Sequence, residues 1–309
     1  MTYLPAKGKI PPPIQPGDTI ALISPSGSIP DDSLKDATTF LTNAGYRVDI
    51  GRNAYHKADY LAGSDKNRFD DIDRALQSNE IKAVICSRGG YGSQRLLDFF
   101  NWDALSSLPP KLFIGFSDLG AFQTPLWLKS NWVSFSGLQA ASGFSGQVQS
   151  KGFQQFLDTL SGNWRGRLKW NDQESVTLEP VEPGSCEGLF LPICLSILVS
   201  LIGTPYLNKL DGVILCVEDI GEAPYRIDRL FWQLGNSGFC DSLSGIVLGS
   251  FIYGKTNITD KAVDSALLHL GKFHYPIWQR IPYGHFPDRL TLPLGVQANI
   301  GTNGSVLFE

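Results

Sequence analysis

A serine at the end of an apolar run is the first residue that could do chemistry. Residues 112–116 read as a buried strand, and Ser117 completes a Gly-x-Ser pattern directly after it. A helix-compatible segment follows from Ala121. A serine on a strand-to-helix turn exposes its hydroxyl, and the next backbone N–H can bind an oxyanion. Because Gly120 comes one residue too late for Gly-x-Ser-x-Gly, Ser117 could equally cap the following helix.

A serine nucleophile needs a base, which is usually histidine, and the chain has 4 histidines. His56 lies in a polar loop, His269 in a predicted helix and His274 in the connection after that helix. His285 lies in a loop rich in proline and glycine, residues 281–286. Loops carry catalytic groups more often than regular elements do, so His285 is our candidate base.

A carboxylate that orients the base could come from a second strand end. Residues 211–217 form a long apolar run, and Glu218 and Asp219 stand at its carboxyl end. An acid there would hold the imidazole tautomer and stabilise the imidazolium. Alternatively, either acid could favour the start of the next helix, for which Pro224 is a typical first residue.

A glycine-rich turn follows the apolar run 83–86. Gly89, Gly90 and Gly92 would let backbone N–H groups approach a ligand closely, as in an anion or oxyanion site. A plain turn between a strand and a helix would use the same residues. The turn is not a nucleotide-binding P-loop, because no Lys-Ser or Lys-Thr pair follows it.

These candidates need a scaffold, and the order of the elements predicts one. Short apolar strands alternate with helical patterns in the first half, which argues for a parallel sheet covered on both faces. Ligands bind beyond the carboxyl ends of such strands. The chain becomes polar and rich in turns after residue 160, and a strongly apolar segment then predicts a buried helix over residues 192–202. We therefore expect an α/β protein with two domains, residues 1–160 and 161–309, and a cleft between them.

Composition narrows the classes of function. The net charge is −4, so bulk electrostatics do not favour nucleic acid. No apolar run is long enough to cross a bilayer and the N-terminus has no secretory pattern, which favours the cytoplasm and no membrane insertion. The 5 cysteines lack Cys-x-x-Cys spacing and are expected to be structural thiols. Without His-Glu-x-x-His or related spacing, we expect no metal and no cofactor.

Seven segments in a fixed order together resemble the LD-carboxypeptidases, or muramoyltetrapeptide carboxypeptidases, a family of serine peptidases. The resemblance covers nearly the whole chain. The segments are GDTIALISPSG at 17–27, YLAGSDKNRF at 60–69, SRGGYGSQRLLDFF at 87–100, IGFSD at 114–118, SLIGTPY at 200–206, VILCVEDIGEAPYRIDR at 213–229 and IPYGHFPD at 281–288.

The resemblance implies roles for particular residues. Ser117 would be the nucleophile, Glu218 the orienting acid and His285 the base, with the N–H groups of Gly90 and Asp118 as the oxyanion hole. A Rossmann-like N-terminal domain would carry the serine. A smaller C-terminal α/β domain, with the character of a swivelling β/β/α fold, would carry the other two residues.

The implied reaction is hydrolysis of the amide between an L-centre of a diamino acid and terminal D-alanine in a peptidoglycan tetrapeptide, during cell-wall recycling. The substrate would be a muropeptide or a UDP-linked tetrapeptide, and a homodimer is the assembly we expect. Two segments depart from the family pattern. Residues 192–195 replace its Gly-Gly-Asn-Leu, and residues 135–137 replace its His-Gly-Pro.

Two alternatives and one further residue remain to be tested. Members of the same family cleave peptidyl-nucleotide antibiotics, as the microcin self-immunity peptidases do. A non-catalytic protein could instead bind a small molecule in the cleft. For a carboxypeptidase, Arg88 beside the glycine turn could clamp the terminal carboxylate, or it could brace the turn through backbone carbonyls or Asp118.

Overall fold

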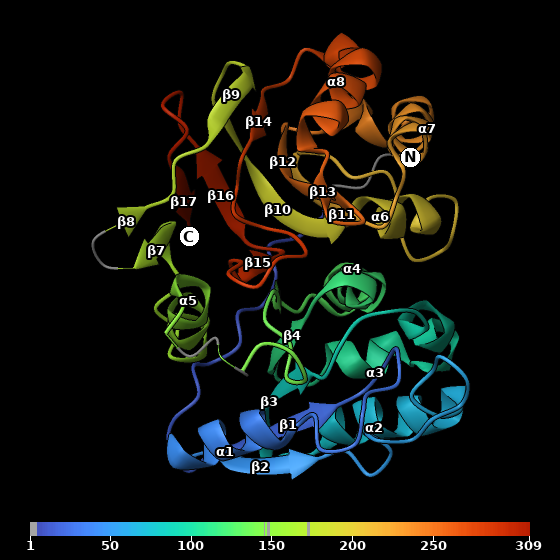
Figure 1. Ribbon diagram of the computed structural model, residues 1–309, viewed down its shortest axis with the longest axis vertical. Coiled ribbons are helices and arrows are strands. Elements are labelled where there is room, and N and C mark those ends of the chain that lie inside the picture. The colour runs from blue at the N-terminus through green and yellow to red at the C-terminus, as the bar shows by residue number, and fades with distance from the viewer. Residues whose placement is uncertain (1–4, 145, 147–148, 172–173) are drawn as a thin grey trace.

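The computed structural model describes residues 5–144, 146, 149–171 and 174–309. The described chain forms two α/β units stacked along the long axis of the molecule (Figure 1). Each unit contains a central sheet with helices packed on it, as the alternation of strand and helix patterns predicts. The mixed α/β class expected from the sequence is therefore confirmed.

The first sheet is parallel in its N-terminal part. Its described strands run in the order β15-β5-β4-β3-β1-β2. The strands are β1 (Thr19–Ile23), β2 (Arg47–Ile50), β3 (Ile81–Cys86), β4 (Leu112–Gly115), β5 (Ser134–Ser136) and β15 (Leu292–Leu294). Strands β1, β3 and β4 are almost entirely buried because helices cover both faces, and this explains why they appear in the sequence as continuous apolar runs.

One strand of the first sheet comes from the far end of the chain. Strand β15 pairs antiparallel with β5, with Pro293 opposite Phe135. The sheet that carries Ser117 is thus completed by residues close to His285 in sequence. The division of the chain at residue 160 stays a prediction, but the two sheets are clearly linked by more than a single crossing of the chain.

The second sheet mixes parallel and antiparallel strands, with β10, β11, β12 and β14 parallel at its centre. Its described strands run in the order β6-β17-β16-β10-β11-β12-β14-β9, and β13 pairs with β12. They are β6 (Gly166–Arg167), β9 (Glu179–Glu182), β10 (Cys186–Cys194), β11 (Val213–Ile220), β12 (Gly245–Tyr253), β13 (Thr256–Asn257), β14 (Ile277–Gln279), β16 (Gln297–Ile300) and β17 (Val306–Phe308). A separate pair joins β7 (Lys169–Asn171) to β8 (Glu174–Ser175).

The helix predicted over residues 192–202 begins later than expected. Residues 192–194 belong to strand β10, and helix α6 covers only Leu195–Leu201. A strand buried on both faces lacks alternation and cannot be distinguished from a buried helix by its pattern. Pro192 is an unusual residue for β10, because proline is rare inside sheets. Strand β16 pairs only with residues up to Leu189, so Pro192 lies where β11 is the one ladder partner among the described strands.

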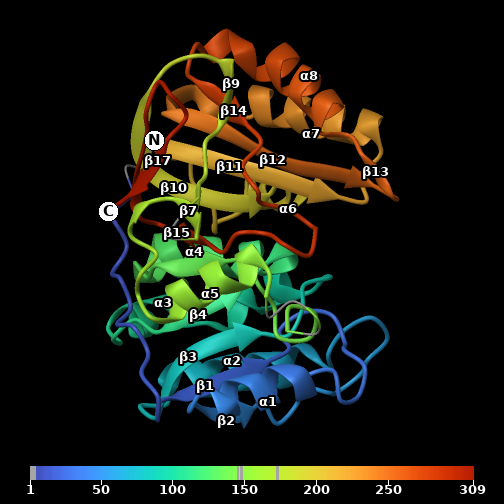
Figure 2. The same cartoon turned by 60° about the vertical axis from the view of Figure 1, so that its left-hand side comes forward.

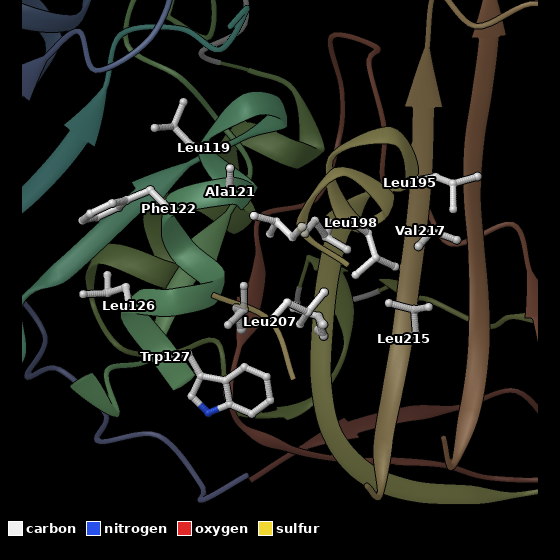
Figure 3. Packing of buried hydrophobic residues seen from close by; sticks show 14 of the residues in the cluster. Leu119, Ala121, Phe122, Leu126, Trp127, Leu195, Leu198, Leu207, Leu215 and Val217 are labelled. Atoms are coloured by element: carbon white, nitrogen blue, oxygen red, sulfur yellow. The ribbon is translucent and has the colours of Figure 1, made fainter. Parts of the chain in front are cut away.

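Helices cover the outer faces of both sheets and fill the space between them (Figure 2). The helices are α1 (Lys35–Asn43), α2 (Asp65–Gln77), α3 (Trp102–Ser106), α4 (Gly120–Ser130), α5 (Lys151–Leu160), α6 (Leu195–Leu201), α7 (Pro224–Asn236) and α8 (Thr259–Leu270). Helix α4 packs against α6 and β10, and it is buried nearly all round. Figure 3 shows the shared core, to which α4 contributes Phe122, Leu126 and Trp127, while α6 and β11 contribute Leu198 and Val217. This packing holds the start of α4, and with it Ser117, between the two sheets.

Three further features of the described chain concern its cysteines, its apolar helices and possible metal ligands. All five cysteines are free and buried, and burial raises the pKa of the Cys86 thiol well above its usual value. No helix within the described part of the chain is long and apolar enough to cross a membrane. The same residues contain no cluster of three or more His, Cys, Asp or Glu side chains that could hold a metal ion.

Candidate active site

Ser117 occupies a strained backbone position between β4 and α4. Its φ angle is 63°, in the left-handed region that residues other than glycine rarely adopt. A 3₁₀ helix, Ser117–Leu119, leads from it into α4. Such strain persists only where the surrounding structure enforces it, and it is common at catalytic positions. The turn has the strand-to-helix form of a nucleophile elbow, although the second glycine of that pattern is displaced.

The glycine turn after β3 packs directly against this serine. A Cβ atom added to Gly89 would lie 2.8 Å from Ser117 Cβ and 3.0 Å from the Phe116 carbonyl oxygen. Only glycine fits at that distance. Gly90 adopts a φ of 106°, which also favours glycine, and no described residue accepts a hydrogen bond from its N–H.

Asp118 ties the two turns together. Its Oδ2 accepts a hydrogen bond from Ser26 Oγ at 2.6 Å and another from the Ser93 N–H at 2.8 Å. The Ser93 hydroxyl in turn donates to the Asp118 carbonyl at 2.5 Å. The side chain is buried, so these bonds are shielded from water and fix the orientation of the peptide that follows Ser117.

His285 and Glu218 form a hydrogen-bonded pair. His285 Nδ1 lies 2.7 Å from Glu218 Oε2, and Glu218 is fully buried near the carboxyl end of β11. Because Nδ1–H donates to the carboxylate, Nε2 is left as the basic nitrogen. Glu218 Oε1 is buried and has no hydrogen-bond partner among the described residues, so the carboxylate is held there by the bond from His285 to Oε2.

The loop that carries His285 is fastened to both sheets. Tyr283 is buried, and its hydroxyl lies 2.7 Å from Ser136 Oγ in β5. The Tyr283 carbonyl accepts a hydrogen bond from the Ser250 N–H of β12 at 2.9 Å. Ser136 thus supports the loop of the candidate base.

The candidate residues gather around one cavity of about 460 Å³. Ser117, Gly90, Arg88 and His285 all line it. Glu218 lies behind His285 and does not line it. The side chains of Ser117 and His285 form no hydrogen bond to each other in the described structure; they face the same space. For His285 to take the proton of Ser117, the two side chains must therefore move closer together. Catalytic hydrogen bonds are often long in hydrolases without substrate.

Arg88 is exposed at the rim of this cavity. Its Nη1 donates a hydrogen bond to the Ser28 carbonyl at 3.1 Å. A guanidinium bound to a backbone carbonyl braces the loop around residue 28, and its remaining N–H groups stay available to a ligand. The position is compatible with both roles considered for Arg88, and its role as a clamp stays a prediction.

A second cavity, of about 320 Å³, adjoins the first and shares Gln139, Ser142, Ile220 and His285 with it. Its other lining residues include Phe286 and Arg289. Sequence reasoning did not identify Gln139 or Arg289 as site residues. Arg289 could have been found as the cation closest in sequence to His285. Gln139 gives no such signal, because it comes to the site only through the packing of its loop.

A second acid lies beside Glu218. Burial and the neighbouring charge of Glu218 raise the pKa of Asp219 to about 6. Asp219 accepts hydrogen bonds from the Ser196 N–H at 2.7 Å and from the Ile220 N–H at 2.8 Å, and it lies 3.4 Å from Cys194 Sγ. Asp219 thus caps helix α6, whereas Glu218 binds the imidazole, and the two acids considered for one role have separate roles in the structure.

The site has the arrangement of a serine hydrolase. It combines a serine on a strained turn, an imidazole held by a buried carboxylate and a glycine turn, all around one cavity. Comparison with known proteins identifies the family. The model of the LD-carboxypeptidase N-terminal domain matches residues 20–137, and that of the LD-carboxypeptidase C-terminal domain matches residues 187–300. The chain belongs to the LD-carboxypeptidase family, and is thus a peptide hydrolase.

Individual relatives agree with this assignment. The murein tetrapeptide carboxypeptidase of Pseudomonas aeruginosa is 29% identical over 92% of this chain and 93% of its own length. The crystal structure of muramoyltetrapeptide carboxypeptidase from Oxalobacter formigenes has a TM-score of 0.81 and 31% identity, covering 94% of this chain and 97% of that one. The microcin C7 self-immunity protein of Escherichia coli is 25% identical over 93% of this chain and 92% of its own length.

Proposed function

We propose that the chain is a serine LD-carboxypeptidase that removes terminal D-alanine from a peptidoglycan tetrapeptide. The scissile amide would join the L-centre of a diamino acid to that D-alanine. The observation that carries the proposal is the placement of Ser117 and the Glu218-oriented His285 around one cavity. The names of the relatives from Pseudomonas and Oxalobacter, which specify a tetrapeptide, support this choice of substrate.

The proposed mechanism follows from the positions of the side chains. His285 Nε2 takes the proton of Ser117 as its Oγ attacks the amide carbonyl, and Glu218 stabilises the resulting imidazolium. The N–H groups of Gly90 and Asp118 stabilise the oxyanion. His285 then gives the proton to the departing amine, and the C–N bond breaks. Water, deprotonated by His285, hydrolyses the acyl-enzyme and frees Ser117.

The test is release of D-alanine from UDP-MurNAc-tetrapeptide, followed by liquid chromatography. Wild-type protein should produce the tripeptide, and Ser117→Ala should not. Binding of the tetrapeptide by wild-type protein without turnover would favour the non-catalytic alternative. The matched control is Ser107→Ala, which removes an exposed hydroxyl at the end of α3, away from both cavities.

A second candidate function comes from the microcin self-immunity relative. An enzyme of that type would cleave a peptidyl-nucleotide. The assay therefore includes an aminoacyl sulfamoyl adenosine as a second substrate at the same concentration. Cleavage of that compound, with no release of D-alanine from the tetrapeptide, would replace our first candidate by the second.

The same proposal includes a place of action and an assembly. Five free, buried thiols suit a reducing compartment, and UDP-linked tetrapeptides occur inside cells, so we place the enzyme in the cytoplasm. Exposed Tyr225 and Trp232 on α7 are residues of the kind that protein interfaces favour, which supports a homodimer. Cell fractionation and analytical ultracentrifugation test these two points. Recovery in the periplasm, or a monomer at micromolar concentration, would contradict them.

A further inference from the structure

Arg289 projects its guanidinium toward the candidate catalytic residues. Its central carbon lies 4.4 Å from the centroid of the Phe116 ring, and the ring of His285 lies 4.6 Å from the same centroid. Phe116 immediately precedes Ser117. The guanidinium, the candidate base and the candidate nucleophile are thus grouped around one aromatic side chain, and Arg289 and His285 line the same cavity.

This guanidinium has no acid to pair with in the described structure. Nη1 donates to the Phe286 carbonyl at 3.1 Å and Nη2 to the Gly137 carbonyl at 3.4 Å, whereas the Nε–H is buried and unpartnered. None of the ion pairs among the described residues includes Arg289. The adjacent Asp288 is already bound by the Gly152 N–H at 2.5 Å.

The environment of Arg289 is costly for a lone charge. Burial lowers its pKa, and the more distant Glu218, already bound to His285, only partly offsets this effect. Arg289 is half-buried, and a poorly hydrated cation without a counter-ion is destabilising unless a ligand supplies the opposite charge. Other arginines that are shielded from water have an acidic partner. The buried Arg68 binds Asp65, and the partly buried Arg74 binds Asp49.

The proposed mechanism indicates which part of the substrate would lie beside the Arg289 guanidinium. His285 must reach the departing nitrogen to protonate it, so the leaving amino acid lies beside the imidazole. Its terminal carboxylate is attached to the carbon next to that nitrogen. The smaller cavity, lined by His285 and Arg289, is therefore where this carboxylate would lie, while the acyl part of the substrate would occupy the cavity of Ser117 and Gly90.

We propose that Arg289 is a specificity-determining residue that binds the terminal carboxylate of the departing D-amino acid. This inference rests on the proposed carboxypeptidase activity. It restricts cleavage to the last residue of a peptide, because an internal peptide bond offers no charge at that position. It also assigns Arg88, which is exposed and bound to the Ser28 carbonyl, to the acyl side of the site and not to the carboxylate.

The experiment compares the tetrapeptide with its C-terminal amide. In wild-type protein, loss of the carboxylate should lower kcat/KM by about 10²-fold, since a partly buried charge pair is lost. Arg289→Met should show a similar loss on the acid and less than about a threefold further loss on the amide. Arg289→Lys keeps a charge but not the planar guanidinium, so its kcat/KM on the acid should lie between those of wild type and Arg289→Met. Arg47→Met, which removes an exposed charge on β2, should leave both substrates unaffected.

A structural role for Arg289 predicts a different pattern. Because its guanidinium packs on Phe116, truncation could displace Ser117 and slow every reaction of the serine. The rate of inactivation by a neutral fluorophosphonate, which carries no carboxylate, measures that effect directly. It should change by less than about threefold in Arg289→Met if the residue acts on the carboxylate.

The outcomes separate the two proposals. Equal losses on acid and amide, or slow inactivation by the fluorophosphonate, would overturn the role of Arg289 while leaving the carboxypeptidase activity in place. If kcat/KM fell only on the acid in Arg88→Lys and did not fall in Arg289→Met, the carboxylate would have to bind in the cavity of Ser117 and Arg88, and the role of Arg289 would be overturned. Wild-type protein that releases no D-alanine would overturn the activity itself and the inference with it.

Discussion

His285 Nδ1 and Glu218 Oε2 lie 2.7 Å apart, although the two residues come from different elements of the second sheet region. Glu218 lies near the end of the long buried strand β11, and His285 lies in a loop that is bound to β12 and to the first sheet. The bond leaves Nε2 as the basic nitrogen of His285, which lines the same cavity as Ser117. The candidate base and its carboxylate are therefore positioned by the second sheet, whereas the candidate nucleophile follows a strand of the first.

Glu218→Gln should abolish most turnover without preventing folding. A glutamine can present an N–H to Nδ1, which favours the tautomer in which Nε2 carries the proton and cannot act as a base. We expect kcat to fall by about 10⁴-fold, as the loss of an orienting carboxylate does elsewhere. Glu187→Gln, a change at an exposed glutamate of the same sheet, is the control and should leave kcat unaltered. Turnover within tenfold of wild type would show that Glu218 does not orient the base.

Ser117→Ala and Ser117→Gly should be equally inactive but differ in stability. Either change removes the hydroxyl, and kcat should fall by about 10⁴–10⁶-fold. The left-handed φ of 63° strains any residue with a Cβ atom, so glycine should raise the free energy of unfolding by about 1 kcal/mol relative to alanine. Urea denaturation measures the difference. Equal midpoints for the two variants would indicate that the turn is not strained.

Gly89→Ala should inactivate the enzyme through the nucleophile. The new methyl group would lie 2.8 Å from Ser117 Cβ and 3.0 Å from a backbone oxygen, so the turn that holds Ser117 must shift. We expect kcat/KM to fall at least about 10²-fold, since a displacement of 1 Å at a catalytic group has that effect. Gly271→Ala is the matched control, because a Cβ atom there meets nothing within 4 Å. Full activity in Gly89→Ala would mean that the two turns can separate freely.

The sequence located the ends of the parallel strands, around which the candidate site residues lie, better than it located the start of helix α6. Ser117 and Gly90 follow β4 and β3, and Glu218 lies near the carboxyl end of β11. The apolar runs of these strands are continuous, and such runs identify where parallel strands end. The same property caused the error at residues 192–194. A strand buried on both faces has no alternation, and the helix that follows it is equally apolar, so the transition from β10 to α6 leaves no trace in the pattern.

Residues that reach the site through long-range packing could not be inferred. Strand β15 joins the first sheet from the far end of the chain, and this connection brings Arg289 and Tyr283 against Phe116 and Ser136. A local pattern contains no information about that pairing. Arg289 was visible as a charge near His285, but its lack of an acidic partner is a property of the folded structure alone.

Asp219 should make the protein less stable as the pH rises from 4 to 7. Its pKa is raised from 3.8 to about 6 in the folded state, chiefly by burial and then by Glu218. Between these values the folded protein holds a proton that the unfolded chain has released. The stabilisation is complete below pH 4 and is lost as the pH passes 6, which amounts to about 3 kcal/mol.

Asp219→Asn removes this titration, so its free energy of unfolding relative to wild type should increase by about 3 kcal/mol between pH 4 and pH 7. The asparagine gives up one acceptor of the Ser196 and Ile220 N–H groups, but that loss is the same at every pH. Urea denaturation at four pH values therefore reports the slope separately from the offset. Asp211→Asn, at an exposed carboxyl before the same strand, is the control. A constant difference between Asp219→Asn and wild type would show that Asp219 ionises in the folded protein as it does in the unfolded chain.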